Sequence, residues 1–137
     1  MSRFFAATFY WIALLHRRDQ WHARVTAFSQ TLTDADSLVT TDAVLLEFLA
    51  AMSAAGTSLR YEAATRVDDM FEDPSVRVIE MTRAQFLEGL ALYKARPDKE
   101  YSLTDCISME VMRRERLTDV LTNDHHFTQE GFRIVFA

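Results

Sequence analysis

Five short strand-like segments, separated by longer helix-like segments, are the feature that most constrains the fold of this chain. The predicted strands are segments 2–7, 37–40, 76–80, 118–121 and 133–136. The predicted helices are segments 9–15, 19–32, 42–56, 58–71, 82–96 and 102–116. Strands separated by one or two helices predict right-handed crossovers onto a mainly parallel sheet. We therefore expect a three-layer α/β/α fold with four to five short strands.

Helix boundaries are indicated by residues that cap or stop helices. The candidate N-caps are Asp19, either Thr41 or Asp42, Thr82 and Ser102. Pro97 is expected to end the helix that Thr82 begins, since proline cannot continue a helix. The boundaries therefore rest on local chemistry as well as on periodicity.

Length, charge and cysteine content exclude several classes of protein. A chain of 137 residues is expected to form one domain over residues 1–137. A net charge of −5 argues against a strongly basic, non-specific nucleic-acid binder. The single cysteine, Cys106, excludes an intramolecular disulfide and is expected to be a buried thiol. The apolar run 4–15 is too short to span a bilayer, so we expect a cytoplasmic protein with no membrane partner.

Ligands of α/β proteins bind at the carboxyl ends of the parallel strands. The residues that follow Ala7, Thr40 and Leu121 are therefore expected on the side of the sheet where chemistry occurs.

Three acidic residues are hard to explain by local structure alone. Glu47 shares a helix face with alanines, where a carboxylate is costly unless it is paired or binds a metal. The alternative is an exposed, alanine-rich face. Asp105 follows Ser102 at the spacing of a capping box, so it either caps the helix or points at a metal. Asp124 lies in a polar turn after a strand, which is either an ordinary loop or a ligand position.

The four histidines are interpreted as surface residues or as residues behind the ligands. His125 and His126 are adjacent, so they cannot both point into one site from a regular element. The i, i+4 pair of zinc-binding helices is absent.

Several motifs together resemble a known family over nearly the whole chain. They are segments 8–15, 18–23 and 40–47, then Ser102-Leu103-Thr104-Asp105-Cys106, then segment 121–127 followed by Gly131-Phe132. In this order they resemble a PIN-domain protein. Small bacterial proteins of this family are mostly toxins of the VapBC type. The resemblance implies a divalent-metal-dependent endoribonuclease that is commonly a homodimer and is held silent by a partner antitoxin.

The resemblance also assigns roles to single residues. Glu47, Asp105 and Asp124 match three of the family's catalytic, metal-binding acids, with Mg²⁺ or Mn²⁺ as the ion. Thr122 matches the hydroxyl residue of the family's turn, and Thr122 and Thr8 are both expected to support the metal ligands from behind. The fourth acid of the family ends the first strand, where this chain has Ala7. We expect a well-folded protein with weak activity, since one metal ligand is missing. Both a naturally degenerate toxin and an introduced Asp-to-Ala change fit this pattern.

Two patches of arginine are candidates for binding RNA phosphates. One contains Arg17 and Arg18, and the other contains Arg113, Arg114 and Arg116. Each is alternatively a solvated helix end, where arginine also suits the helix dipole.

The competing function is a catalytically dead PIN fold that binds a partner chain, with N-terminal aromatic residues in part lining a groove. A DNA-directed nuclease is disfavoured by the small size of the chain.

Overall fold

A five-stranded parallel sheet runs through the centre of the molecule. The computed structural model describes residues 1–137 and gives the strand order β3-β2-β1-β4-β5. The strands are β1 (Arg3–Ala6), β2 (Ser37–Thr41), β3 (Val76–Ile79), β4 (Asp119–Leu121) and β5 (Arg133–Ile134). Every neighbouring pair is parallel. The sheet predicted from the short strand-like segments is thus confirmed, with five strands.

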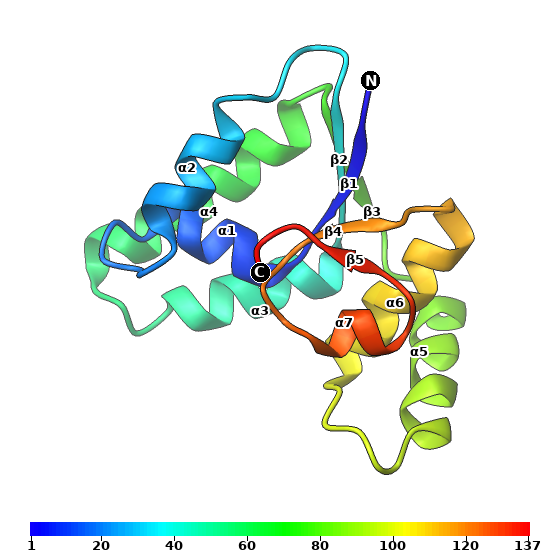
Figure 1. The fold of residues 1–137 in the computed structure, drawn as a ribbon. Coiled ribbons are helices and arrows are strands. Elements are labelled where there is room, and N and C mark those ends of the chain that lie inside the picture. The colour runs from blue at the N-terminus through cyan, green and yellow to red at the C-terminus, as the bar shows by residue number, and fades with distance from the viewer.

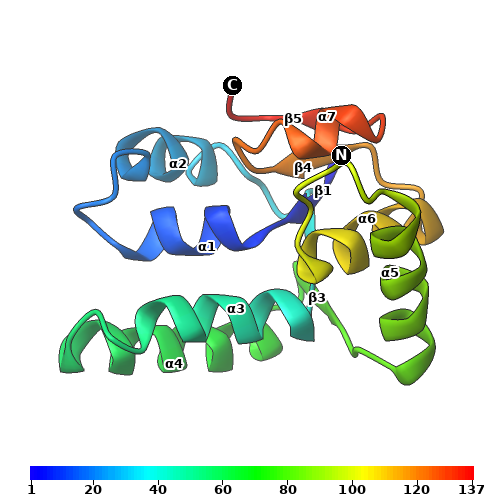
Figure 2. The same ribbon diagram turned by 90° about the horizontal axis from the view of Figure 1, so that it is seen from below.

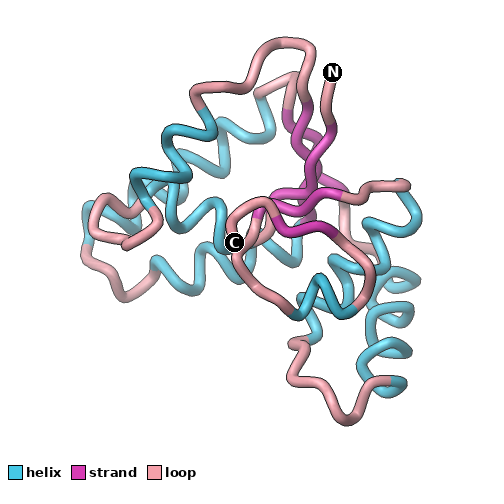
Figure 3. Tube along the Cα trace, in the orientation of Figure 1, coloured by secondary structure: helices cyan, strands magenta, loops and turns pink.

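Helices cover the sheet on both sides. They are α1 (Thr8–Leu15), α2 (His22–Ser29), α3 (Asp42–Met52), α4 (Thr57–Glu72), α5 (Arg83–Ala95), α6 (Leu103–Glu115) and α7 (His126–Gln129). Figures 1 and 2 show α1 to α4 gathered on one side of the strands and α5 with α6 on the other. The strands, magenta in Figure 3, lie between these two groups. The three-layer α/β/α prediction is therefore confirmed.

Some predicted helix boundaries are wrong. Asp19 does not cap α2, which begins at His22; the Asp19 carboxylate instead accepts a hydrogen bond from the Trp21 amide at 2.8 Å and closes the preceding turn. The third helix ends at Met52, four residues before Gly56. The short helix α7 was not predicted, because a single turn carries no periodic pattern.

The predicted caps Thr41, Thr82 and Ser102 are confirmed, since each side chain accepts a hydrogen bond from a backbone amide in the first turn of its helix.

The aromatic residues near the N-terminus mostly belong to the core. Phe5, Tyr10 and Trp11 are buried. Phe9 and Phe28 are partly buried and pack edge-on or tilted against neighbouring rings. They stabilise the layer between β1, α1 and α2 rather than forming an open aromatic surface.

The strand register brings two distant parts of the chain together at the carboxyl edge of the sheet. Ala6 of β1 is paired with Leu121 of β4. The residues that follow, Ala7 and Thr122, therefore lie side by side. No helix of the structure combines the length and the apolar character needed to cross a bilayer.

Candidate metal centre

A cavity of about 170 Å³ lies where β1 and β4 end. Among the residues that line it are Ala7, Thr8, Glu47, Asp105, Thr122 and Asp124. These are all the residues for which the sequence predicted catalytic, metal-binding or supporting roles. The three acids come from α3, from α6 and from the turn after β4, so only the tertiary structure brings them together.

Asp105 caps its helix, as one of the two alternatives predicted, and it also lines the cavity. It forms a capping box with Ser102: its Oδ2 accepts a hydrogen bond from the Ser102 amide at 3.0 Å, and its own amide donates to the Ser102 hydroxyl at 3.0 Å. This fixes the carboxylate at the first turn of α6, and Oδ1 takes no part in these hydrogen bonds. The cap therefore positions the Asp105 carboxylate and leaves one of its oxygens without a hydrogen bond.

Asp124 is held in a similar way by its own turn. Its Oδ1 accepts a hydrogen bond from the His126 amide at 2.9 Å, and its amide donates to the Thr122 hydroxyl at 3.3 Å. Thr122 is 2% exposed, so its hydroxyl is a rigid anchor for the turn. Oδ2 of Asp124 takes no part in these bonds.

Glu47 reaches the cavity from α3, which packs against both α1 and α6. Its side chain is half-buried. The predicted alanine-rich face is partly exposed, since Ala50, Ala51 and Ala54 face solvent while Ala43 is buried. Glu47 thus lies at the inner end of an exposed stripe, where the helix meets the cavity.

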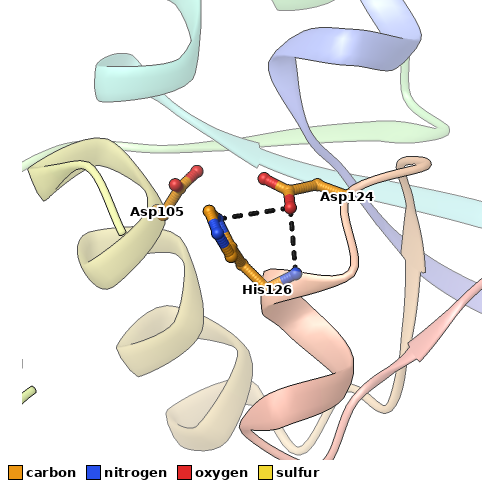
Figure 4. A group of neighbouring side chains, drawn as sticks. All are labelled: Asp105, Asp124 and His126. Carbon is orange, nitrogen blue, oxygen red and sulfur yellow. Dashed lines mark hydrogen bonds and ion pairs between the residues drawn. The ribbon is translucent and has the colours of Figure 1, made fainter. Parts of the chain in front are cut away.

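His126 lies beside two of the acids, although the sequence analysis interpreted it as a surface residue or as one behind the ligands. Asp105, Asp124 and His126 each offer one ligand atom, and these atoms lie within 4.8 Å of one another. Figure 4 shows the three side chains converging from α6, the turn and the start of α7. Its neighbour His125 is exposed. The side chains of His125 and His126 differ in exposure because the one-turn helix α7 begins between them, and no sequence pattern predicted that helix.

The electrostatics of the cavity fit a bound cation. Burial raises the pKa of Asp105, and the charges of Asp124 and Glu47 raise it further, against a lowering by the Ser102 hydrogen bonds. Carboxylates that repel one another in a partly buried cavity gain stability from a divalent cation. Oxygen ligands of this kind suit Mg²⁺ and Mn²⁺.

Ala7 and Thr8 also line the cavity. Ala7 is 8% exposed and occupies the N-cap position of α1, where no side chain satisfies the first amides of the helix. The hydroxyl oxygen of Thr8 is buried and has no hydrogen-bond partner in the protein. The cavity therefore has a free hydroxyl and, at Ala7, a wall without charge.

The two predicted arginine patches differ in their contacts. Arg113 donates to Glu110 and Glu130, and Arg114 pairs with Glu88. Arg116 ends α6 with a left-handed backbone at φ 58°. Arg17 and Arg18 are exposed beyond the end of α1, without an ion pair.

Cys106 is buried, which confirms the prediction, and burial raises the pKa of its thiol to about 11.

The fold and the acidic cavity agree with a family comparison. The family model described as the PIN domain matches residues 8–132. The chain therefore belongs to the PIN domain family. No curated protein sequence matches it significantly.

Solved structures with the same fold include toxins and toxin–antitoxin pairs. VapC20 of Mycobacterium tuberculosis, described as a sarcin–ricin loop cleaving toxin, has a TM-score of 0.82 at 24% identity, over 94% of this chain and 95% of that one. FitAcB of Neisseria gonorrhoeae has a TM-score of 0.68 at 16% identity, over 98% and 96%. VapBC2 of Rickettsia felis, bound to a promoter DNA fragment, has a TM-score of 0.65 at 11% identity, over 98% and 97%.

Proposed function

We propose that this chain is a divalent-metal-dependent endoribonuclease toxin of a toxin–antitoxin pair, weakened by Ala7 in place of an active-site aspartate. The observation that carries the proposal is the convergence of Glu47, Asp105 and Asp124 on one cavity at the carboxyl edge of the sheet. Membership of the PIN family and the likeness to VapC toxins support it.

In this proposal Glu47, Asp105 and Asp124 hold Mg²⁺ or Mn²⁺. A bound ion of this kind activates water and offsets negative charge on the phosphate oxygens during hydrolysis of a phosphodiester. The Ser102 cap holds Asp105 in place, and the buried Thr122 hydroxyl holds the turn of Asp124. The buried Thr8 hydroxyl, which has no partner in the protein, is assigned a supporting position behind the ligands.

The same proposal explains why this form should cleave slowly. Ala7 offers no ligand where the resemblance implies an acid, so the ion is held by fewer oxygens and more weakly. An aspartate at this position would extend from the N-cap of α1 into the same cavity.

An antitoxin and a second copy of the chain are the expected partners. The likeness to toxin–antitoxin pairs such as VapBC2 supports a partner protein. Exposed Phe86, Leu87 and Tyr93 on α5 provide apolar surface that a partner would cover. Sedimentation velocity of the purified chain tests the homodimer: we expect a species of twice the chain's mass, whereas a monomer at all concentrations contradicts it.

The function is tested by comparing this chain with its Ala7→Asp variant. Each is incubated with total tRNA and rRNA, including RNA that contains the sarcin–ricin loop, in Mg²⁺ or Mn²⁺ and in EDTA. We expect the variant to cleave RNA in a chelator-sensitive manner and this chain to cleave far less.

Adding Asp105→Asn to the active variant should abolish cleavage, and Asp119→Asn is the matched control, because Asp119 pairs with Arg133 outside the cavity. If neither chain cleaves RNA or binds metal, the catalytically dead partner-binding protein becomes the better description.

A further inference from the structure

The imidazole of His126, beside the candidate metal centre, has a ring nitrogen that makes no hydrogen bond. Its Nδ1 is buried and has no hydrogen-bond partner. That atom lies at ion-pair distance, 3.3 Å, from Oδ1 of Asp124 without hydrogen-bond geometry, and the His126 side chain points toward both aspartates (Figure 4). A buried nitrogen without a partner costs free energy unless a ligand satisfies it.

The surroundings of His126 hold its ring in this direction. The Tyr101 ring packs edge-on against it, with centroids 5.3 Å apart and an interplanar angle of 62°. Tyr101 is 4% exposed, and its hydroxyl donates to Glu130 at 2.9 Å. Glu130 is in turn fixed by Arg96 and Arg113. The ring is therefore oriented by a rigid, fully paired network.

We propose that His126 is a metal ligand in this chain, alongside Asp105 and Asp124. This inference rests on the proposed function, because it concerns the ion of the same centre. Two ligands at right angles around an ion with bonds of about 2.1 Å lie about 3 Å apart. The 3.3 Å between Nδ1 of His126 and Oδ1 of Asp124 suits two adjacent positions of one coordination sphere.

An imidazole nitrogen among the ligands would change which divalent ion the centre prefers. Ala7 contributes no oxygen ligand, whereas His126 offers an imidazole nitrogen within 4.8 Å of ligand atoms of Asp105 and Asp124. Imidazole favours transition metals, whereas Mg²⁺ prefers oxygen ligands. We therefore expect this chain to bind Mn²⁺ and Co²⁺ in preference to Mg²⁺, by a margin that depends on His126.

Metal binding without RNA tests the inference. The affinities of Mn²⁺ and Mg²⁺ are measured by titration calorimetry for this chain, for His126→Phe, which keeps a ring against Tyr101, and for His126→Ala. His125→Ala is the matched control, because His125 is the exposed neighbour. Thermal melting in EDTA verifies that each variant is folded.

Pulsed electron paramagnetic resonance of the Mn²⁺-loaded chain adds a readout that needs no variant, since it detects a bound imidazole nitrogen directly.

We expect a nitrogen coupling to Mn²⁺ in this chain and in His125→Ala, and its loss in both His126 variants. Residues that merely orient ligands typically change metal affinity by roughly 10–100-fold. The His126 variants should lose at least about tenfold in Mn²⁺ affinity, and less in Mg²⁺ affinity.

A Mn²⁺ spectrum without nitrogen coupling, or unchanged Mn²⁺ affinity in both folded His126 variants, overturns the inference. If Asp105→Asn still removes Mn²⁺ binding in that case, the proposed carboxylate centre survives. If this chain and Ala7→Asp both bind no divalent ion, the inference and the metal-dependent function fail together.

Discussion

At the scale of single residues, an acid at position 7 in place of Ala7 would have two opposite effects on the stability of the fold. An aspartate there would cap α1, which contributes about 1 kcal/mol. It would also bring a further negative charge to the cavity of Glu47, Asp105 and Asp124. Like charges a few ångströms apart repel by up to about a few kcal/mol each at an effective dielectric near 20. Without metal, this repulsion should therefore outweigh the gain from capping.

We therefore expect Ala7→Asp to melt below this chain in EDTA and to gain the larger increase in melting temperature when Mn²⁺ is added. Ala7→Asn is the control, since it caps the helix without adding charge and should melt higher in EDTA with no gain in the Mn²⁺ response. Differential scanning calorimetry measures both. A Mn²⁺ response that is equal for all three chains would show that position 7 does not face the ion.

Glu130 is the second residue with a defined energetic role. Burial alone would raise its pKa, but hydrogen bonds from Arg96, Arg113 and Tyr101 lower the pKa to about 2. A carboxyl whose pKa is lowered by folding stabilises the protein above its unfolded pKa, and this stabilisation is lost as the pH falls toward the folded pKa.

Glu130→Gln should therefore lower the free energy of unfolding by roughly 2–3 kcal/mol at pH 7. The difference should shrink between about pH 4.5 and pH 2, because the wild-type carboxyl becomes protonated in both states. Urea unfolding at pH 7, 4 and 2.5 measures it. A difference that stays constant with pH would mean that Glu130 acts by packing alone.

At the scale of elements, α5 and α6 approach each other at Gly89. A Cβ built on Gly89 would lie 2.4 Å from Cγ1 of Ile107 and 3.1 Å from its Cα and amide nitrogen. The side-chain atom could move, but the backbone of α6 could not. Since α6 carries Asp105 at its first turn, the packing at Gly89 also sets the position of one acid of the proposed metal centre.

Gly89→Ala should destabilise the protein by about 1–3 kcal/mol, although alanine is normally the better residue within a helix. Gly56→Ala is a control of a different kind, because Gly56 has open space around it and is strained only by its φ of +102°. Thermal unfolding and Mn²⁺ affinity are measured together. Only Gly89→Ala is expected to weaken metal binding, and unchanged stability would contradict the close packing.

At the scale of the whole molecule, the distribution of charge decides where RNA can lie. The net charge is −5, so binding depends on local groups of free cations. Arg113 and Arg114 are engaged by carboxylates, whereas Arg17 and Arg18 are exposed and unpaired. We expect the phosphate backbone to follow the side of the molecule that carries Arg17 and Arg18.

Replacing both Arg17 and Arg18 by Gln should weaken RNA binding at low salt and reduce the slope of log K against log salt by about 1.4, the value for two phosphate contacts on a single strand. The corresponding change at Arg113 and Arg114 should affect stability more than the salt slope. Fluorescence anisotropy with labelled single-stranded RNA measures the slopes. Equal slopes for the first variant and the parent chain would place the RNA elsewhere.

Much of the candidate site could be predicted from the sequence, because its acids belong to recognisable local patterns. Asp105 lies in a capping box with Ser102, and Asp124 follows a strand in a polar turn. The position of His126 could not be predicted, since it depends on a one-turn helix and on contact with Tyr101 from a distant segment. Which arginines are free could not be predicted either, because ion pairs such as Arg113 with Glu130 join parts far apart in the chain.

The alternation of strands and helices and most of the helix starts could be read directly from the residues of each segment. These features depend on periodicity and on hydrogen bonds within a single turn, which neighbouring residues make among themselves. Tertiary contacts were needed to show that Ala7, Glu47, Asp105 and Asp124 share one cavity and that His126 lies beside Asp105 and Asp124. Strand register and helix packing set those distances, and both are properties of contacts between residues remote in sequence.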